Sequence, residues 1–461
     1  MSDTAYKSHA FEALYTAAEM RAAEERYPDY PDSVPELMER AGTAVACEAM
    51  LAFPDARRFA CVCGGGSNGG DGRVAARVLR EAGLDARETT EVEGYDVLVD
   101  ALFGTGFHGE PRPDAATLIE RINGADTPVV SIDLPSGVDA STGEIAGAAV
   151  RADLTVTFHG WKVGLVVAPG RVHAGRVVAA DIGLERTSTD HRRATRNLLR
   201  TVPRRKDGDT KYTAGAVLVV GGHPGMTGAA SLSARAALRA DAGYVTLAVP
   251  EESLSVFEAL VVEPVKIGWR EENALPTITQ AADRARAVAI GPGLGRSEQR
   301  QRLVRELLAQ LDLPIVVDAD GLFGLEPVAR SAPTVLTPHA GELARLLDTD
   351  STWVDAHRLE AATTAADRFG AVVILKGRDT IVAAPGEGVI VSDFGPPSLA
   401  TAGTGDVLTG VVAAFLAKGM EVQVAAAAAA VAQGVAASSA PHQTGLIAGD
   451  LPDLLPAALE G

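Results

Sequence analysis

The stretch Arg58-Phe-Ala-Cys-Val-Cys-Gly-Gly-Gly-Ser-Asn-Gly-Gly-Asp-Gly-Arg-Val-Ala-Ala-Arg-Val-Leu-Arg80 decides the fold of the first half of the chain. Its apolar beginning, residues 58–63, has the length of a buried strand, and residues 73–80 have the apolar spacing of a helix. The glycine-rich turn between them leaves backbone N–H groups unpaired at a helix N-terminus, where the helix dipole favours a negative charge. The stretch therefore predicts an α/β fold with a phosphate site, or else a purely structural glycine turn.

Further strand-length apolar runs alternate with helical patterns on both sides of this stretch. In the first half two helices are predicted at residues 15–27 and 35–50, and further strands at residues 95–103, 128–132, 154–158 and 177–181. In the second half, strands are predicted at residues 216–220, 244–249, 285–290, 314–318, 334–337, 371–375 and 380–383. This alternation is typical of mostly parallel sheets covered by helices on both faces. We therefore expect two three-layer αβα domains.

A basic segment separates the two halves. Residues 191–206 contain seven Arg or Lys and no acid, whereas the whole chain has 42 basic and 60 acidic residues. We interpret the segment as a solvated linker that lies against an acidic surface, because a nucleic-acid patch would carry interleaved aromatic residues. The predicted domains are residues 1–190 and 207–461, joined by the linker 191–206.

The composition limits the classes of partner. A chain of 461 residues with a net charge of -18 disfavours nucleic acid and anionic membranes, so we expect small-molecule ligands. Only seven basic residues are lysine, which fits either concentrated salt or a GC-rich genome. Cys61 and Cys63 would share one face of their strand as reduced core residues. Residues 1–10 lack an apolar signal core, and the apolar run 422–434 is too short for a membrane span, so it predicts a buried helix. We expect a cytoplasmic homo-oligomer.

Acidic and small polar residues follow three neighbouring predicted strands of the first half. Asn68 and Asp71 lie in the glycine-rich turn, Asp100 lies in Val99-Asp-Ala-Leu-Phe-Gly104, and Ser136 lies in Asp133-Leu-Pro-Ser-Gly-Val-Asp139. The carboxyl ends of neighbouring parallel strands meet at one edge of a sheet, so these side chains are expected to lie together. One such acid is usually a helix cap, but three strand ends of this kind indicate a binding site.

These motifs, with Leu37-Met-Glu-Arg-Ala-Gly42 and Thr157-Phe-His-Gly-Trp-Lys-Val-Gly164, resemble the NAD(P)H-hydrate epimerase (YjeF N-terminal) family over residues 10–187. The resemblance implies a Rossmann-like fold, a bound potassium ion and interconversion of the R and S epimers of hydrated NADH and NADPH. By motif, the potassium positions are matched by Asn68, Asp100 and Ser136, a set of oxygen donors that suits a hard, weakly charged cation. The substrate-binding positions are matched by Ser67, Asn68, Gly69, Gly70, Asp71, Gly104, Thr105, Gly106, Phe107, His108, Gly109, Glu110 and Asp133. Asp133 is our candidate for proton transfer, and a ribose contact is the alternative role.

In the second half, the run Leu399-Ala-Thr-Ala-Gly-Thr-Gly-Asp-Val-Leu-Thr-Gly410 precedes an apolar helical pattern. Gly403 and Gly405 leave the N–H groups of that helix start open to an anion. Asp406 lies in the same first turn, where it would accept the proton of a hydroxyl that attacks phosphorus. This layout is typical of a sugar-kinase-like site, and a helix-capping Asp after a glycine turn is the alternative.

Other strand ends of the second half carry glycine, acid or histidine, and the set resembles a second family. His339 and Glu342 would position phosphate and magnesium, or would only cap a helix. With Leu218-Val-Val-Gly-Gly222, Ile290-Gly-Pro-Gly-Leu-Gly295 and Leu375-Lys-Gly-Arg-Asp-Thr380, these runs resemble the NAD(P)H-hydrate dehydratase (YjeF C-terminal, ribokinase-like) family over residues 203–458. By motif, the hydrate-binding positions are matched by Ala229, Gly293, His339 and Asp406. The nucleotide-binding positions are matched by Lys376, Gly377, Arg378, Asp379, Thr380 and Gly405.

Both resemblances in one chain imply a bifunctional repair enzyme. The first domain would convert the R hydrate to the S hydrate. The second would transfer the terminal phosphoryl group of ADP or ATP to the substrate hydroxyl, and ADP would become AMP. Asp406 would act as the base, and Mg²⁺ would neutralise the phosphate charge. Loss of phosphate would then restore NAD(P)H. The sequence does not decide whether the co-substrate is ADP or ATP, or whether the preferred substrate is hydrated NADH (NADHX) or hydrated NADPH (NADPHX). The alternatives are a ribokinase-like small-molecule kinase fused to a nucleotide-binding sensor domain, and a module that only binds NAD(P)-like ligands.

Overall fold

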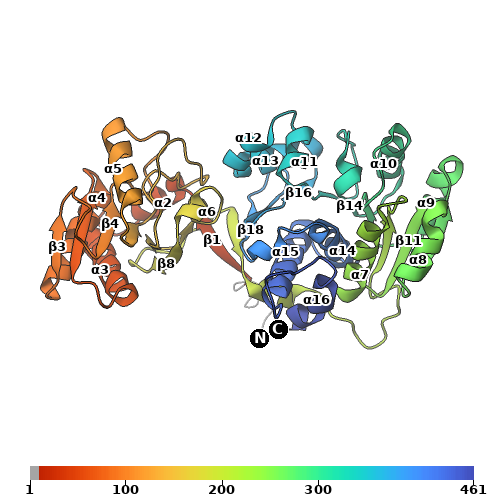
Figure 1. Ribbon diagram of the computed structural model, residues 1–461, viewed down its shortest axis with the longest axis horizontal. Coiled ribbons are helices and arrows are strands. Elements are labelled where there is room, and N and C mark those ends of the chain that lie inside the picture. The colour runs from red at the N-terminus through yellow and green to blue at the C-terminus, as the bar shows by residue number, and fades with distance from the viewer. Residues whose placement is uncertain (1–9, 461) are drawn as a thin grey trace. The chain divides into compact units, whose positions relative to one another are not determined.

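The computed structural model describes residues 10–460, which form two compact units. The N-terminal unit comprises residues 13–191 and 355–357, and the C-terminal unit comprises residues 10–12, 192–354 and 358–460. Each unit has a central sheet with helices on both faces (Figure 1). The predicted three-layer α/β class is confirmed for both units.

The sheet of the N-terminal unit contains parallel strands only. In spatial order they are β3 (Asp85–Glu88), β2 (Arg58–Cys63), β4 (Val97–Ala101), β5 (Val129–Ile132), β6 (Leu154–Phe158) and β8 (Arg176–Ala180). The helices of this unit are α2 (Ala17–Glu24), α3 (Val34–Ala52), α4 (Ser67–Glu81), α5 (Pro113–Gly124) and α6 (Gly170–His173). Because β2, β4 and β5 are neighbours, their carboxyl ends lie side by side, as the sequence predicts.

Side chains of β2 alternate between the two faces of this sheet. Phe59 and Cys61 belong to the core beneath α3 and α4, whereas Ala60 and Val62 belong to the core beneath α5. Cys63 packs against the same core as Cys61, and both thiols are free. The predicted shared face of the two cysteines is therefore confirmed.

The sheet of the C-terminal unit is parallel from β12 to β16, and β17 runs antiparallel to its two neighbours. In spatial order the strands are β12 (Val265–Trp269), β11 (Tyr244–Pro250), β10 (Ala216–Val220), β13 (Ala287–Ile290), β14 (Ile315–Val317), β15 (Thr334–Leu336), β16 (Val372–Leu375), β17 (Thr380–Ala383), β18 (Ile390–Ser392) and β9 (His191–Ala194). The helices are α7 (Thr227–Arg239), α8 (Leu254–Leu260), α9 (Ala274–Ala282), α10 (Glu298–Gln310), α11 (Ala340–Leu346), α12 (Ser351–Ala356), α13 (Arg358–Phe369), α14 (Thr404–Ala417), α15 (Val422–Ser438) and α16 (Leu451–Glu460).

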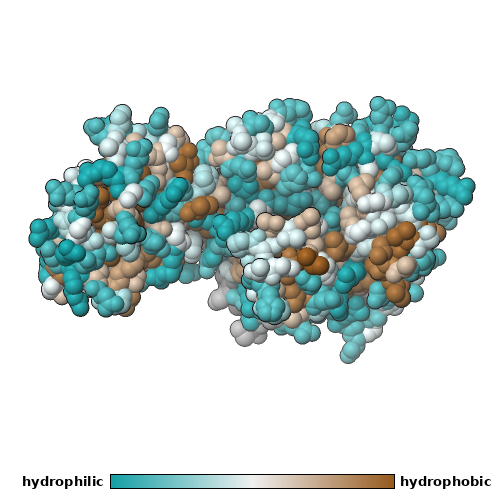
Figure 2. All heavy atoms as spheres, in the orientation of Figure 1, coloured by the Kyte–Doolittle hydropathy of each residue, from teal (hydrophilic) through white to brown (hydrophobic). Residues whose placement is uncertain are grey.

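Helices α7, α14, α15 and α16 share one core with the sheet, and α9 and α13 also contact its strands. The alanine-rich α15 lies inside this core, with Ala425 to Ala429 fully buried. The predicted close-packed helix over residues 422–434 is therefore confirmed. No helix within residues 10–460 is long and apolar enough to cross a membrane. Figure 2 shows hydrophilic side chains over most of the visible face, as the net charge of -18 leads one to expect.

The helix predicted over residues 15–27 begins too early. Strand β1 (Phe11–Tyr15) comes first and pairs with β7 (Trp161–Lys162) through Leu14 and Tyr15. Helix α2 then starts after Thr16, whose hydroxyl accepts from the Glu19 N–H while the Glu19 carboxylate accepts from the Thr16 N–H. This capping box fixes the helix start, which the apolar spacing alone does not reveal.

The interpretation of residues 191–206 as a solvated linker is wrong. The segment contains β9 and a 3₁₀ helix, η2 (Arg196–Thr201), and its Leu198 and Leu199 are buried in the core of the C-terminal unit. Its charges do meet acids, as expected: Arg193 pairs with Asp393 at 2.9 Å and with Glu12 at 2.7 Å. The many basic residues concealed the apolar residues that anchor this segment.

Candidate active sites

The glycine-rich stretch after β2 forms the first turn of α4 rather than a loop. The helix begins at Ser67, after Gly66. A Cβ atom on Gly69 would lie 1.9 Å from the Gly64 carbonyl oxygen, and one on Gly72 would lie 2.6 Å from the Ala101 Cβ. Glycine therefore lets the helix start lie directly against the ends of β2 and β4, with its N–H groups available to an anion.

The three predicted potassium residues meet around the backbone of Phe103. The Asn68 amide donates to the Phe103 carbonyl at 2.9 Å, and the Phe103 N–H donates to the Ser136 hydroxyl at 2.9 Å. That hydroxyl donates to Asp100 Oδ1 at 2.6 Å. The structure thus brings Asn68, Asp100 and Ser136 into one hydrogen-bonded group.

Asp100 is completely buried and is the centre of this group. Its Oδ2 accepts from the Ser131 hydroxyl at 2.8 Å and from the Ser136 N–H at 2.9 Å, and its Oδ1 also accepts from the Leu102 N–H at 3.3 Å. Burial raises the pKa of Asp100, and the hydrogen bonds from Ser136 and Ser131 oppose that rise. The residue joins the ends of β4 and β5 and is not a simple helix cap.

Asp133 is held by a lysine to which the sequence assigned no role. Its Oδ1 lies 2.6 Å from Lys162 Nζ, and its Oδ2 accepts from the Thr105 N–H at 3.2 Å. Lys162 is fully buried and also donates to the Thr157 hydroxyl at 2.7 Å and to the Phe158 carbonyl at 2.8 Å. Asp133 itself has a φ of 67°, a left-handed conformation that is uncommon outside glycine and that clusters at functional sites.

Two further carboxyl groups interact with Asp133. Burial, followed by the charges of Asp133 and Glu24, raises the pKa of Asp71 to about 8. Burial, followed by the charge of Asp133, also raises the pKa of Glu24 above its ordinary value. None of the residues 10–460 donates a hydrogen bond to the Asp71 carboxyl, whereas Asp133 has several donors. Glu24 comes from α2 and belongs to no motif, so no sequence pattern indicates its place in this site.

Residues 104–110 contribute unevenly to this site. Thr105 reaches Asp133, and the Phe107 ring stacks on Phe103 with centroids 4.7 Å apart. The other members of the predicted substrate loop are largely exposed: Gly106, His108, Gly109 and Glu110.

In the C-terminal unit, Asp406 lies in the first turn of α14, as predicted. The helix is preceded by Gly403, whose φ of 91° suits glycine. Burial, followed by the nearby charge of Asp318, raises the pKa of Asp406 to about 7, and Lys376 opposes this rise. A carboxyl group with this pKa is suited to accept a proton near neutral pH.

Lys376 follows β16 and reaches the start of α14. Its Nζ lies 2.9 Å from Asp318 Oδ1 and 3.6 Å from Glu342 Oε2, and a Cβ atom on Gly405 would lie 3.0 Å from it. Burial alone would lower the pKa of Lys376, but Asp318 and Glu342 outweigh it and raise that pKa. Asp318 is itself buried and accepts from the Thr409 hydroxyl at 2.7 Å. The sequence placed Asp318 at a strand end without assigning it a role.

His339 and Glu342 form the cap of α11. His339 Nδ1 accepts from the Gly341 N–H at 3.0 Å, and Glu342 Oε2 accepts from the His339 N–H at 2.9 Å. The two residues therefore cap α11, which is the alternative that the sequence left open. Their predicted roles toward phosphate and magnesium stay predictions. Ala229 and Gly293 lie together, since a Cβ atom on Gly293 would lie 3.3 Å from that of Ala229.

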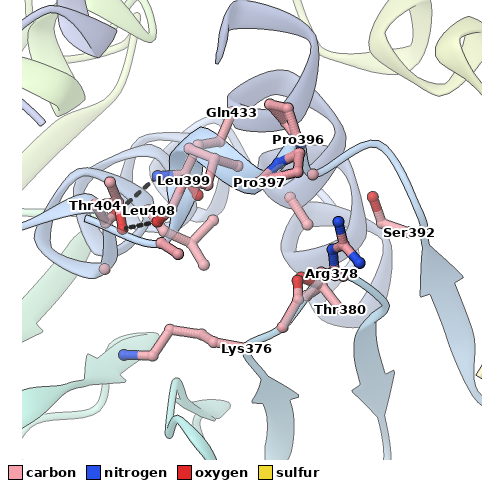
Figure 3. Close-up of a pocket in the computed structure, with 15 residues that line it drawn as sticks. Lys376, Arg378, Thr380, Ser392, Pro396, Pro397, Leu399, Thr404, Leu408 and Gln433 are labelled. Carbon is pink, nitrogen blue, oxygen red and sulfur yellow. Dashed lines mark hydrogen bonds between the residues drawn. The ribbon is translucent and has the colours of Figure 1, made fainter. Parts of the chain in front are cut away.

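A cavity of about 450 Å³ opens beside the start of α14. Figure 3 shows that Arg378 and Thr380 of the β16–β17 turn lie on one side of it and Leu399 and Thr404 on another. Its size suits a nucleotide-sized ligand. Its lining includes Lys376, Gly377, Arg378, Thr380, Gly405 and Gln433.

Asp379 is placed differently from the other residues of the predicted nucleotide loop. It is buried, it accepts from Arg358 of α13 at 2.9 Å, and it is not among the residues that line the cavity. A Cβ atom on Gly377 would lie 2.4 Å from the same guanidinium group. Asp379 therefore fixes the shape of the turn from behind.

An open helix start, a carboxyl of raised pKa, a partly exposed ammonium group and a nucleotide-sized cavity are the features of a phosphoryl-transfer site, and the C-terminal unit has the ribokinase-like fold. A family model described as NAD(P)H-hydrate dehydratase matches residues 217–460, and one described as YjeF-related protein N-terminus matches residues 34–89 and 84–164. The chain belongs to the family of bifunctional NAD(P)H-hydrate repair enzymes, and both resemblances found in the sequence are confirmed.

Individual relatives agree with this assignment. The chain is 38% identical to the Moorella thermoacetica bifunctional NAD(P)H-hydrate repair enzyme, over 97% of this chain and 96% of the relative. It is 36% identical to the Salinibacter ruber enzyme of the same name, over 96% of this chain and 95% of the relative. A similar solved structure is that of the Bacillus subtilis ADP/ATP-dependent NAD(P)H-hydrate dehydratase, co-crystallised with ATP and Mg²⁺. Its sequence is 29% identical and its TM-score is 0.52, and the match covers 58% of this chain and 96% of the Bacillus chain.

Proposed function

We propose that this chain repairs hydrated NADH and NADPH in two steps. The N-terminal unit interconverts the R and S epimers, and the C-terminal unit uses ADP or ATP to dehydrate the S form. The observation that carries the second step is Asp406 in the first turn of α14, beside the Lys376 ammonium and a cavity of about 450 Å³. The names of the relatives support both steps.

In the dehydratase step, Asp406 accepts the proton of the substrate hydroxyl as the hydroxyl oxygen attacks the terminal phosphorus. An O–P bond forms, and the bridging P–O bond breaks with its electron pair going to the departing nucleotide. Phosphate then leaves the ring with the C–O electron pair, and loss of a proton from the neighbouring carbon restores the double bond. Water is a poor leaving group and phosphate a good one, which accounts for the use of a nucleotide.

Magnesium would neutralise charge on the transferring phosphates in this step. The carboxylate predicted to hold it, Glu342, accepts from the His339 N–H and lies 3.6 Å from Lys376 Nζ. A carboxylate with these partners retains oxygen lone pairs for a hard cation, so the donor set fits. We propose ADP or ATP, together with Mg²⁺, as the co-substrate.

In the epimerase step, the hydroxyl lies on the ring carbon next to nitrogen, so its loss is assisted by the nitrogen lone pair. Asp71, protonated at neutral pH because its pKa is about 8, donates a proton to the departing hydroxyl. Asp133, positioned by Lys162 at 2.6 Å, accepts a proton from the water that returns to the opposite face. Re-addition from either face interconverts the two epimers.

The proposal includes a potassium ion held by Asn68, Asp100 and Ser136. Neutral oxygens and one carboxylate suit a weakly charged, hard cation, and the three side chains share one hydrogen-bonded group. The ion would supply positive charge beside the phosphates of the substrate. Because Asp100 already accepts four hydrogen bonds, Asn68 and the Phe103 carbonyl would provide the remaining ligands.

We also propose that the two activities reside in separable domains, in a cytoplasmic homo-oligomer. The three cysteines are free, which suits a reducing compartment. Since residues 192–194 of β9 belong to the C-terminal unit, a dehydratase fragment should start before His191 so that the strand stays whole. Such a fragment should stay folded and retain dehydration, and light scattering on the whole chain should give more than one chain per particle.

One experiment tests the proposed function directly. Purified protein is supplied with mixed hydrate epimers and either ADP or ATP with Mg²⁺, and the return of dihydronicotinamide absorbance is followed. Recovery of the whole mixture requires both activities, whereas recovery of the S fraction alone would remove the epimerase assignment. A stable phosphorylated product without recovery would instead indicate a small-molecule kinase.

A further inference from the structure

The Lys376 side chain does not point toward the rest of its own turn. Figure 3 shows it extending away from Arg378 and Thr380, although Lys376 is among the residues that line the cavity. Its Nζ ends 2.9 Å from Asp318 and would lie 3.0 Å from a Cβ atom on Gly405. The ammonium group therefore lies at the first turn of α14, next to Asp406, where phosphoryl transfer takes place under the proposed function.

The charges around this point are mostly negative. The charges of Asp318, Asp320 and Glu342 all raise the pKa of Asp406. Of the described residues with the strongest effect on this pKa, Lys376 is the one that lowers it. A phosphoryl group that carries several negative charges cannot approach so many carboxylates without a compensating cation. Lys376 is a fixed cation of the chain at this position.

Lys376 also has donors to spare. An ammonium group has three N–H bonds, and within residues 10–460 Lys376 donates one hydrogen bond, to Asp318. Its distance of 3.6 Å to Glu342 is an ion-pair distance rather than a hydrogen bond. The remaining N–H bonds are available to phosphoryl oxygens.

Asp318 fixes the position of the Lys376 ammonium group. Asp318 is 1% exposed, and its second oxygen accepts from the Thr409 hydroxyl of α14 at 2.7 Å. This bond joins the end of β14 to the same helix that carries Asp406. Donors fixed before the reaction stabilise developing charge without a reorganisation cost.

We propose that Lys376 is a catalytic residue whose ammonium group holds the transferring phosphoryl group beside Asp406, and that Asp318 and Thr409 are positioning residues for it. The inference rests on the proposed dehydratase function. It assigns Lys376 to the chemical step, beyond nucleotide binding.

The test compares Lys376→Gln with the wild type and with Lys206→Gln, an exposed lysine outside the site. We expect Lys376→Gln to lower the kcat of dehydration about 10²- to 10³-fold, the usual effect of removing a transition-state donor. The Kd of ADP or ATP, measured by calorimetry, should rise as well, because the ammonium offsets the carboxylates in the bound ground state, but by a smaller factor than the fall in kcat, because the donor acts most strongly in the transition state. In Lys376→Ala, added methylammonium should restore part of the lost kcat, which a purely structural lysine would not allow.

A second variant covers the case in which Lys376→Gln does not fold. Thr409→Val keeps both charges and nearly the same shape, and should lower kcat about tenfold with an unchanged nucleotide Kd. An unchanged kcat in either variant, or a rise in nucleotide Kd that accounts for the whole loss, would overturn the proposal while the proposed function stands. A wild type that binds nucleotide but never dehydrates the hydrate would overturn both.

Discussion

Each unit places a lysine among carboxylates, but Lys162 is fully buried whereas the Lys376 side chain is 20% exposed, and the two lysines are bonded differently. Lys162 lies 2.6 Å from Asp133 and donates to Thr157 and Phe158, so all three of its N–H bonds have partners. Among the described residues, the Lys376 ammonium group donates a single hydrogen bond, to Asp318. The two lysines therefore have different roles. Lys162 holds the Asp133 carboxylate in place, whereas Lys376 has N–H groups available for a ligand.

The proton-transferring carboxyl groups of the two units also differ in their surroundings. In the N-terminal unit, burial and then the charges of Asp133 and Glu24 raise the pKa of Asp71 to about 8. In the C-terminal unit, burial and then the charge of Asp318 raise the pKa of Asp406 to about 7, and Lys376 opposes this rise. A nearby cation favours the carboxylate form, so these surroundings suit Asp71 to give a proton and Asp406 to accept one.

The largest expected effect is that of Asp406→Asn. Removing the base should lower dehydration of the S hydrate by at least about 10³-fold, while epimerisation and nucleotide affinity remain near the wild-type values. The two activities are measured separately, by absorbance recovery from pure S hydrate and by chromatography of the epimers. Equal loss of both activities would contradict the assignment of one step to each unit.

Lys162→Met should act mainly on stability. Removing the partner of a buried carboxylate costs about 3–5 kcal/mol, so the N-terminal unit should unfold at lower temperature or denaturant concentration. Lys376→Gln should destabilise the C-terminal unit less, because Asp318 keeps the Thr409 hydrogen bond. Thermal unfolding of both variants checks this ranking, and the reverse order would break the comparison between the two lysines.

The pH dependence of the two steps should run in opposite directions. Asp406 must be deprotonated to act as base, so dehydration should rise about tenfold per pH unit below a pKa of about 7 and level off above it. Asp71 must be protonated to act as acid, so epimerisation should fall as the pH rises through about 8. Profiles of kcat for each step at constant ionic strength check both limbs. An epimerisation rate that rises through pH 8 would exclude Asp71 as the proton donor.

Asp100→Asn should have the smallest effect. The amide keeps most of the shape and some hydrogen bonds of the carboxylate but removes the charge that favours a cation. Epimerisation of the R hydrate should fall several-fold and lose its response to potassium at matched ionic strength. An identical potassium response in wild type and variant would leave Asp100 with its structural role alone, joining the ends of β4 and β5.

The sequence predicted those parts of the molecule that follow from local pattern. The strand, glycine turn and helix of residues 58–80 follow from periodicity and helix-start chemistry, and Asp406 follows from its place after Gly403 and Gly405. The convergence of Asn68, Asp100 and Ser136 follows from the rule that parallel strands end at one edge. In the first two cases the decisive information lies within a few residues of the site, and in the third it needs only the additional rule that neighbouring strands run parallel.

Other parts depend on contacts that no local pattern records. Lys162 reaches Asp133 because β7 pairs with β1, and Glu24 faces the same site from α2. The motif around Lys376 did not say that Asp379 turns toward Arg358 while its neighbours line the cavity. Strands β3, β12 and β18 are short or partly exposed, and their apolar pattern was too weak to be recognised.

The course of the chain through β1 also bears on how the protein is made. Residues 10–12 belong to the C-terminal unit, where the Ala10 carbonyl accepts from the Thr195 N–H at 2.9 Å, yet they are translated before the N-terminal unit. Domains generally fold as units during synthesis, so most of the N-terminal unit can fold once residues 13–191 have emerged from the ribosome. Residues 10–12 reach their native partners only after β9 and the core of the C-terminal unit have been made. Within the described chain, these early residues are therefore among the last to form their native contacts.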